Sequence, residues 1–161
     1  MTAKYQSNLL SIKVRHSKSP YQMPVNVERP FRVMLIDDNI IDLKINSKII
    51  QLSKLFDEII QCHSAEEALN YFHSHSKEPH TLPNLILLDI QMPEMDGFDF
   101  LDIYKSLPED WKVSCQVAML SSTLDFGDIQ KAEANSYVIK LLKKPLIPTE
   151  LENLLRSNFS F

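Results

Sequence analysis

Four polar segments stand directly after apolar runs of the chain, and their side chains could together carry out phosphoryl chemistry. Asp37 and Asp38 follow the run FRVMLI, and Asp89 follows the run LILL. Ser121 follows the run QVAML, and Lys144 comes shortly after the last apolar run. Three carboxylates brought to one place repel one another by about 4 kcal/mol per pair at ~4 Å and an effective dielectric constant of ~20. Such a cluster therefore requires protons or a bound cation.

The ligand chemistry of this cluster favours a hard divalent cation. Oxygen ligands without Cys or His suit Mg2+, which keeps several waters and uses one or two carboxylates. A further carboxylate beside that ion and a lysine is a plausible phosphoryl acceptor, because aspartate forms an aspartyl phosphate. The ion and Lys144 would offset charge on the transferring group, and the Ser121 hydroxyl would donate a hydrogen bond to it.

Alternating apolar runs and helical patterns supply the elements that must position these residues. Expected strands cover 31–36, 58–62, 85–88, 116–120 and 137–142, and expected helices cover 40–54, 64–72, 98–106, 126–134 and 149–156. Five strand–helix units predict an α/β fold with a parallel sheet covered by helices on both faces. The carboxyl ends of parallel strands meet at one edge of such a sheet, where ligands bind. The polar segments would converge at that edge.

Local patterns support two of the expected helices. The segment Ser64-Ala-Glu-Glu67 has the spacing of a capping box, which predicts a helix start there. Apolar residues at near-helical spacing predict an amphipathic helix over 40–54: Ile41, Ile45, Ile49, Ile50 and Leu52.

Four motifs, taken together, resemble the signature of bacterial response regulator receiver domains. The stretch LLDIQMPEMDG at 87–97 resembles the family's phosphorylation site, and LIDDN at 35–39 resembles its acidic pair. MLSS at 119–122 is similar to its hydroxyl site, and KKP at 143–145 is similar to its Lys-Pro pair. The motifs occur in the family's order, and the resemblance covers about residues 31–158. It implies a doubly wound, flavodoxin-like sheet of five parallel strands in the order 2-1-3-4-5.

The resemblance also implies a role for each matching residue. Asp89 would be the phosphoacceptor. Asp38, Asp89 and the backbone carbonyl of Gln91 would bind Mg2+ directly, whereas Asp37 would act on the ion mainly through water. Ser121 and Lys144 would contact the phosphoryl oxygens.

Neighbouring residues leave some of these assignments open. Ser122 or Thr123 could supply the hydroxyl in place of Ser121. Lys143 competes with Lys144, although the adjacency of Pro145 favours Lys144. The resemblance further implies a Lys144–Pro145 bond that can be cis, and a tight turn at Asp96-Gly97 before the next helix.

The switch region departs from the usual pattern of the family. By resemblance it comprises Ser122, Leu141 and Pro145. Many receivers carry an aromatic residue three positions before the lysine, and that ring swings inward on phosphorylation. Leu141 stands there in this chain, so only a smaller apolar rearrangement remains open. The segment 135–140 also lacks the usual Gly-Ala, which leaves less backbone freedom.

Charge and composition exclude several classes of protein. Residues 1–30 hold five basic residues against one acidic residue, so we expect an irregular basic N-terminal extension before a receiver domain at 31–158. Residues 31–161 hold 12 basic and 20 acidic residues, a balance that does not suit a nucleic-acid surface. No apolar stretch approaches the ~20 residues needed to cross a bilayer, and no signal peptide stands out. These features predict a cytoplasmic protein.

Other reactive or aromatic side chains have simpler interpretations. Cys62 and Cys115 belong to no CxxC pair, so buried thiols are expected. The histidines around position 75 lack an acidic or Cys partner at metal-binding spacing, which indicates a polar loop. Trp111 and Phe126 could be either contacts for a partner or a satellite of the core.

The sequence therefore predicts a stand-alone response regulator in two-component phosphorelay signalling. It would not be an enzyme beyond self-catalysed phosphoryl acceptance and autodephosphorylation. A sensor histidine kinase or phosphotransfer protein would supply the phosphoryl group, and an unidentified downstream protein would read it. The chain would act without a DNA-binding output domain and away from membranes, as a monomer or a phosphorylation-dependent dimer. The segments 108–115 and 121–125 resemble small stand-alone regulators of the Bacteroidetes type.

Two rival functions are less well supported by these residues. A pseudo-receiver, which binds partners but never carries phosphate, would not need the complete set of acidic residues, hydroxyl and lysine. A phosphohydrolase of the haloacid-dehalogenase kind needs a second Asp two residues after its nucleophile, and Gln91 stands at that position.

Overall fold

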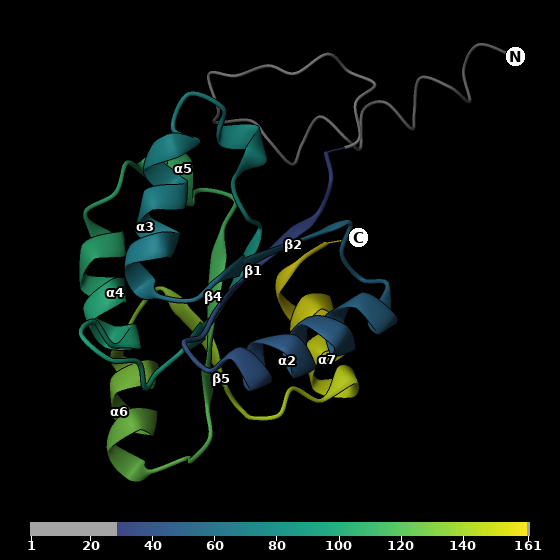
Figure 1. Cartoon of the computed structure of the whole chain (residues 1–161), viewed down its shortest axis with the longest axis vertical. Coiled ribbons are helices and arrows are strands. Elements are labelled where there is room, and N and C mark those ends of the chain that lie inside the picture. The colour runs from purple at the N-terminus through teal and green to yellow at the C-terminus, as the bar shows by residue number, and fades with distance from the viewer. Residues whose placement is uncertain (1–28, 161) are drawn as a thin grey trace, which may run out of the picture.

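Five parallel strands form the central sheet, in the order β2-β1-β3-β4-β5 (Figure 1). The computed structural model describes residues 29–160. The strands are β1 (Arg32–Ile36), β2 (Glu58–Cys62), β3 (Leu85–Asp89), β4 (Gln116–Ser121) and β5 (Val138–Lys143). This arrangement confirms the predicted fold class and strand order.

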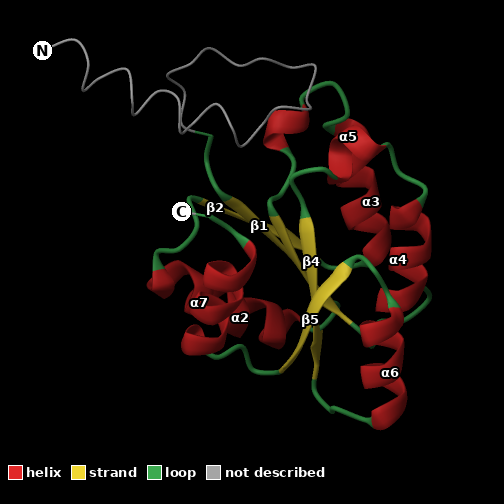
Figure 2. Cartoon of the chain, turned by 180° about the vertical axis from the view of Figure 1, so that it is seen from behind, coloured by secondary structure: helices red, strands yellow, loops and turns green. Residues whose placement is uncertain are grey.

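Helices cover both faces of the sheet (Figure 2). One face carries α2 (Ile40–Ser53) and α7 (Pro148–Asn158), which contact each other. The other face carries α3 (Ala65–Ser74), α4 (Gly97–Lys105) and α6 (Phe126–Ala134), with the short α5 (Glu109–Lys112) close by. In the described part of the chain, no helix is long and apolar enough to cross a membrane.

The central strands separate two apolar cores. Successive side chains of a strand point to opposite faces, and in β1 Met34 and Ile36 join the core under α3 and α4, while Val33 and Leu35 join the core under α2 and α7. All residues of β1 and β3 are buried, as expected for strands covered on both faces. The outer strands β2 and β5 carry exposed residues. Residues at the carboxyl ends of β1 and β3 are therefore attached to strands that are packed on both faces.

Capping side chains begin several helices where the sequence predicts them. Ser64 Oγ accepts a hydrogen bond from Glu67 N at 3.0 Å and starts α3. Asn39 Oδ1 accepts from Ile41 N at 2.9 Å and from Asp42 N at 3.2 Å, which fixes the first turn of α2.

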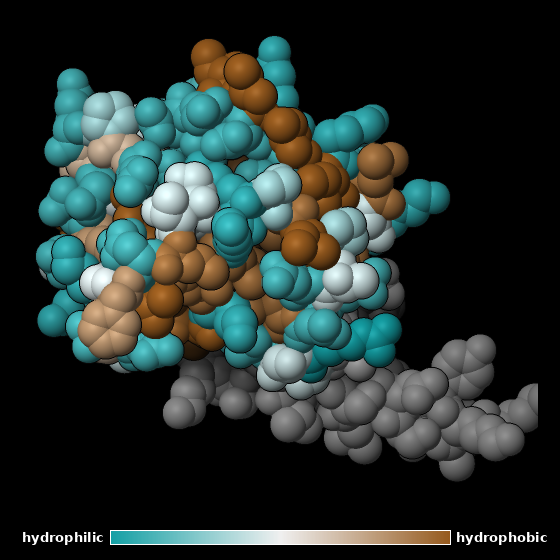
Figure 3. Space-filling view, turned by 90° about the horizontal axis from the view of Figure 1, so that it is seen from below, coloured by the Kyte–Doolittle hydropathy of each residue, from teal (hydrophilic) through white to brown (hydrophobic). Residues whose placement is uncertain are grey.

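The apolar pattern of α2 was only partly a guide to burial. The helix forms as predicted, but its buried residues are Leu43, Asn46 and Ile50. Ile41 and Leu52 are 69% and 67% exposed. Of the five apolar residues in the pattern, Ile50 is buried and Ile49 packs against the core, whereas Ile45 is exposed like Ile41 and Leu52. Figure 3, a view from below Figure 1, shows apolar side chains at the surface among polar ones.

Two short elements were not predicted. The chain forms α5, a single turn that begins after Pro108, and a 3-10 turn at Pro79–Thr81 in the expected loop. The described residues thus hold six α-helices rather than five. A turn of four residues is too short to show a helical period. Lys112 stabilises α5, because its buried Nζ donates to Lys105 O at 2.8 Å.

The remaining predictions about the chain have different outcomes. Cys62 and Cys115 are free thiols, and Cys62 is buried while Cys115 is half-buried. The aromatic residues differ: Trp111 packs against the core, whereas Phe126 is 73% exposed. The basic extension at 1–30 lies almost entirely outside the described residues and stays a prediction, as does the domain boundary at 31.

Candidate functional site

The carboxyl ends of the neighbouring strands β1 and β3 bring the acidic residues together. Ile36 pairs with Leu88 in the parallel register, so Asp37 and Asp89 follow at the same level of the sheet. Carboxylate oxygens of Asp37, Asp38 and Asp89 all lie within 4.8 Å of one another. The predicted convergence of three strand-end carboxylates is therefore present in the structure.

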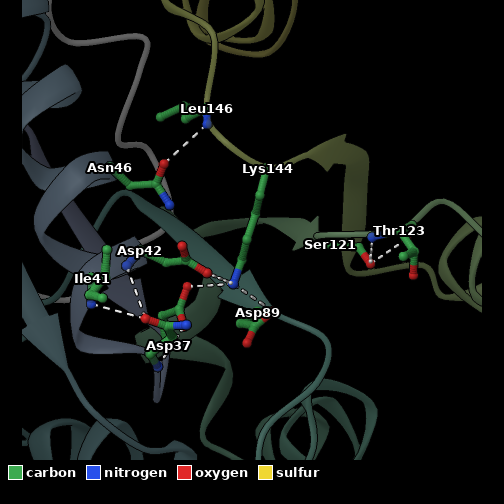
Figure 4. A network of polar contacts seen from close by, with 10 residues as sticks. Asp37, Ile41, Asp42, Asn46, Asp89, Ser121, Thr123, Lys144 and Leu146 are labelled. Carbon is green, nitrogen blue, oxygen red and sulfur yellow. Dashed lines mark hydrogen bonds and ion pairs between the residues drawn. The ribbon is translucent and has the colours of Figure 1, made fainter.

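Lys144 neutralises part of this cluster. Its Nζ lies 2.7 Å from Asp37 Oδ2, 3.1 Å from Asp89 Oδ1 and 3.1 Å from Asp42 Oδ2 (Figure 4). The side chains of Lys144, Asp37 and Asp89 are only 9%, 4% and 5% exposed. The ammonium thus lies in a largely dehydrated pocket, where charge interactions are stronger than in water.

Burial shifts the proton affinities of the buried groups. Loss of hydration raises the pKa of Asp89 to about 6, although the charge of Lys144 opposes that rise. Loss of hydration also raises the pKa of Asp37, against the hydrogen bond with Lys144. Burial by itself lowers the pKa of Lys144, but the hydrogen bond with Asp37 and the charge of Asp89 outweigh it and raise that pKa above its ordinary value. Lys144 therefore remains charged, but one ammonium neutralises only one of the carboxylates around it.

The acidic cluster fits a divalent metal ion. Asp37, Asp38 and Asp89 together with Lys144 carry a formal charge of −2 when all are ionised. Asp37 Oδ2 is buried, and apart from its ion pair with Lys144 it accepts no hydrogen bond of regular geometry. Asp38 is exposed beside the two buried carboxylates, so the cluster is open to solvent on one side. Oxygen donors alone, open to water, are the environment that Mg2+ prefers.

The residues around Asp89 hold it in place. The backbone amide of Gln91 lowers the pKa of Asp89, against the larger effect of burial, and the Gln91 side chain itself is exposed. Gly97 begins α4 directly against the strand end, with Asp96 as its N-cap. A Cβ atom at Gly97 would lie 2.5 Å from the Asp89 carbonyl oxygen. A glycine is thus required at position 97 because the backbone of α4 approaches the end of β3 closely. A positive φ is not the reason, since the φ of Gly97 is not positive.

Ser121 reaches the edge of the sheet but does not join the lysine network. It is the last residue of β4, and its side chain is 1% exposed. Its Oγ donates to Thr123 O and accepts from Thr123 N at 3.2 Å, so the hydroxyl is bound within its own loop (Figure 4). Ser122 and Thr123 are exposed.

The segment that carries Lys144 is anchored at several points. Lys144 N donates to Ser121 O at 2.8 Å, and Leu146 N donates to Asn46 Oδ1 at 3.0 Å. The Lys144–Pro145 bond is cis, as expected. Leu141 is half-buried against the core, while Pro145 is exposed.

Two residues of α2 belong to the site although their sequence pattern did not predict it. Asp42 binds Lys144, and Asn46, one helical turn further, binds the backbone of Leu146. Asn46 could have been noticed, because it is a polar residue flanked at helical spacing by Leu43 and Ile50. Asp42 gave no comparable signal, since an acidic residue in a first helical turn is common.

Comparisons with known proteins agree with this geometry. The family model described as the response regulator receiver domain matches residues 33–156. A protein of Staphylococcus epidermidis called an uncharacterized response regulatory protein is 34% identical over 126 residues, which are 78% of this chain and 45% of that protein. The chain thus spans about half the length of this curated relative.

Solved structures match nearly along their full length. A two-component response regulator from Cytophaga hutchinsonii has a TM-score of 0.74 and 32% identity, covering 81% of this chain and 97% of that one. A response regulator receiver protein from Dyadobacter fermentans has a TM-score of 0.70 and 36% identity, covering 79% of this chain and 96% of that one.

Proposed function

The chain belongs to the response regulator receiver domain family of two-component signalling, and from that premise we propose that it accepts a phosphoryl group on Asp89. The observation that carries this proposal is the position of Asp89 between the Lys144 ammonium at 3.1 Å and two further carboxylates within 4.8 Å. A sensor histidine kinase or a phosphotransfer protein would be the donor.

The transfer exchanges one bond to phosphorus for another. An oxygen of the ionised Asp89 carboxylate attacks the phosphorus of a phosphohistidine, the P–N bond breaks, and the imidazole leaves. The Lys144 ammonium already lies 3.1 Å from the attacking carboxylate. It can therefore stabilise the negative charge of the phosphoryl oxygens with little movement of its side chain. Hydrolysis of the resulting acyl phosphate by water would return Asp89 to its first state.

Mg2+ is the proposed cofactor. Asp38, Asp89 and the Gln91 carbonyl would bind it directly, and Asp37 would bind through water. When bound, the ion would offset negative charge on the transferring group. The three carboxylates within 4.8 Å of one another and the excess negative charge of the cluster support this assignment.

The proposed output is a change in protein binding. Phosphorylation replaces the single negative charge of the Asp89 carboxylate with a phosphoryl group of charge about −1.5 to −2, which stands further out from the edge of the sheet. Ser121 would leave its bonds to Thr123 to contact the phosphoryl group, and Ser122, Leu141 and Pro145 would move with it. A downstream partner would bind this altered surface, whether the chain acts alone or pairs on phosphorylation.

Intact mass spectrometry tests this function. The protein is incubated with Mg2+ and acetyl phosphate, alongside Asp89→Asn and the exposed control Asp110→Asn. The expected result is one phosphate adduct on the wild type and on Asp110→Asn, and none on Asp89→Asn. A wild type without an adduct would act as a pseudo-receiver and refute the proposal. Steady turnover of organic phosphates would instead indicate a phosphohydrolase.

A further inference from the structure

Lys144 has a carboxylate partner that lies outside the proposed metal cluster. Asp42, in the first turn of α2, places its Oδ2 3.1 Å from Lys144 Nζ. The side chain of Asp42 is 34% exposed, whereas those of the other two partners, Asp37 and Asp89, are 4% and 5% exposed. Of the three carboxylates that pair with Lys144, Asp42 can therefore be rehydrated most easily if its ion pair breaks.

We propose that Asp42 is a positioning residue that holds the Lys144 ammonium in the unphosphorylated protein and competes with the phosphoryl group for it. This inference rests on the proposed function, in which Lys144 contacts the phosphoryl oxygens. Asp42 itself would touch neither the phosphoryl group nor the metal ion.

The number of donors on Lys144 is the first argument. An ammonium has three N–H donors, and Lys144 faces three carboxylates. On phosphorylation the Asp89 carboxylate becomes an acyl phosphate, and its share of the ammonium passes to one phosphoryl oxygen. A second phosphoryl oxygen can bind Lys144 only if Asp37 or Asp42 gives up its share. Leaving a buried carboxylate unpaired is costly, whereas a partly exposed one regains water. Asp42 is therefore the partner that is released at the lowest cost.

The fixed location of Asp42 is the second argument. Asn39 holds its backbone, since Asp42 N donates to Asn39 Oδ1 at 3.2 Å. One turn further along α2, Asn46 Oδ1 accepts from Leu146 N at 3.0 Å. The helix thus contacts the lysine segment twice, once at the Lys144 side chain and once at the backbone two residues later. The contact of Asp42 belongs to this paired attachment and is not an isolated surface ion pair (Figure 4).

Charge gives the direction of the effect. The Asp42 carboxylate shares the ammonium that the phosphoryl group needs, and it also repels that anion. Asp42→Asn keeps the shape of the side chain but removes the charge. We expect it to bind fluoroberyllate, a phosphoryl mimic, about fivefold more tightly than the wild type at saturating Mg2+, the size of a partly exposed charge-assisted contact.

The test compares three variants with the wild type by titration with fluoroberyllate at saturating Mg2+. Asp42→Glu keeps the charge and should stay within about twofold of the wild type. Asp102→Asn removes an equal charge from the exposed surface of α4 and should also leave the affinity unchanged. If the wild type binds fluoroberyllate and Asp42→Asn binds it no more tightly, the inferred competition by Asp42 is refuted. The proposed function of Asp89 is not affected by that result.

A second measurement does not depend on phosphoryl binding. NMR of the Lys144 side chain in the metal-free protein should show shifted Cε and Nζ resonances in Asp42→Asn and little change in Asp102→Asn. Unmoved resonances would refute the contact itself. A wild type that binds no fluoroberyllate, with shifted resonances in Asp42→Asn, would refute the proposed function and the competition with phosphate, and leave Asp42 only as a partner of Lys144.

Discussion

Asn46 and Leu146, which are 100 residues apart in the chain, share a buried hydrogen bond of 3.0 Å. Asn46 is 1% exposed and Leu146 is 2% exposed. Asn46 Oδ1 is thus the acceptor for a backbone N–H that lies two residues after Lys144. Asn46, the polar residue on the buried face of α2, thus attaches the segment that follows Lys144 to the helix that follows Asp37 and Asp38.

Asn46→Ala should therefore lower the free energy of unfolding by about 1–3 kcal/mol, because it leaves the buried Leu146 N–H without a partner. Chemical denaturation measures this effect. Asn70→Ala is the matched control, since Asn70 is an exposed residue of α3 and alanine favours the helix. Equal stabilities of the two variants would show that the Asn46 bond contributes nothing.

The two glycines of the chain should respond to alanine in opposite directions. Gly97→Ala should lower the free energy of unfolding by roughly 1–3 kcal/mol, because its Cβ would lie 2.5 Å from the Asp89 carbonyl oxygen. Gly127→Ala should raise it by up to about 1 kcal/mol, because that site lies in α6 and its nearest atom would be 3.4 Å away. Thermal or denaturant unfolding of both variants decides this. A neutral Gly97→Ala would contradict the tight approach of α4 to the strand end.

The stability of the metal-free protein should depend on the ionisation of Asp89. Burial raises the pKa of Asp89 from 3.8 to about 6. Below pH ~4 the carboxyl is protonated in both the folded and unfolded states, and its ionisation costs the fold nothing. Between about pH 4 and pH 6 the unfolded chain releases this proton while the folded protein keeps it, so the folded state loses stability as the pH rises, and above about 6 the loss is complete and constant.

Asp89→Asn should remove that cost. In metal-free buffer at pH 7.5 its free energy of unfolding should exceed that of the wild type by on the order of 2 kcal/mol, and the difference should disappear below pH ~4. Denaturant titrations at a series of pH values provide the measurement. A gain that is the same at all pH values would show that it does not arise from the titration of Asp89.

Mg2+ should stabilise the wild type by binding to the folded state. The unfolding midpoint should rise with ion concentration, as expected for a ligand that binds only the native protein. Asp38→Asn should weaken the apparent Mg2+ affinity by roughly tenfold or more, because it removes a proposed direct ligand. The exposed Asp99→Asn on α4 serves as the control, and an Asp38→Asn affinity like that of the control would exclude Asp38 as a ligand.

The sequence predicted the parts of the site that directly follow strands. Asp37, Asp38, Asp89 and Lys144 could be placed together because parallel strands end at one edge, and the apolar runs marked those ends clearly. The strand order and the alternation of helices were also confirmed. Local patterns were enough for the strand ends and the helices, whereas the strand order, which depends on pairing between distant segments, came from the resemblance to receiver domains.

The missed features depend on contacts between distant parts of the chain. Asp42 and Asn46 acquire their partners from residues 102 and 100 positions away. The isoleucines of α2 indicated its buried face only in part, because Ile41 and Ile45 are exposed while the polar Asn46 lies on the inner face. Similarly, the bond of Ser121 to the Thr123 carbonyl depends on the conformation of a loop that its sequence does not specify.

The most direct test of the central claim locates the phosphoryl group itself. The protein is treated with Mg2+ and acetyl phosphate and then reduced with borohydride, which converts an aspartyl phosphate to homoserine, and peptides are sequenced by mass spectrometry. Homoserine is expected at position 89 only, dependent on both Mg2+ and acetyl phosphate. Homoserine at another aspartate, or none in protein that is otherwise folded, would contradict it.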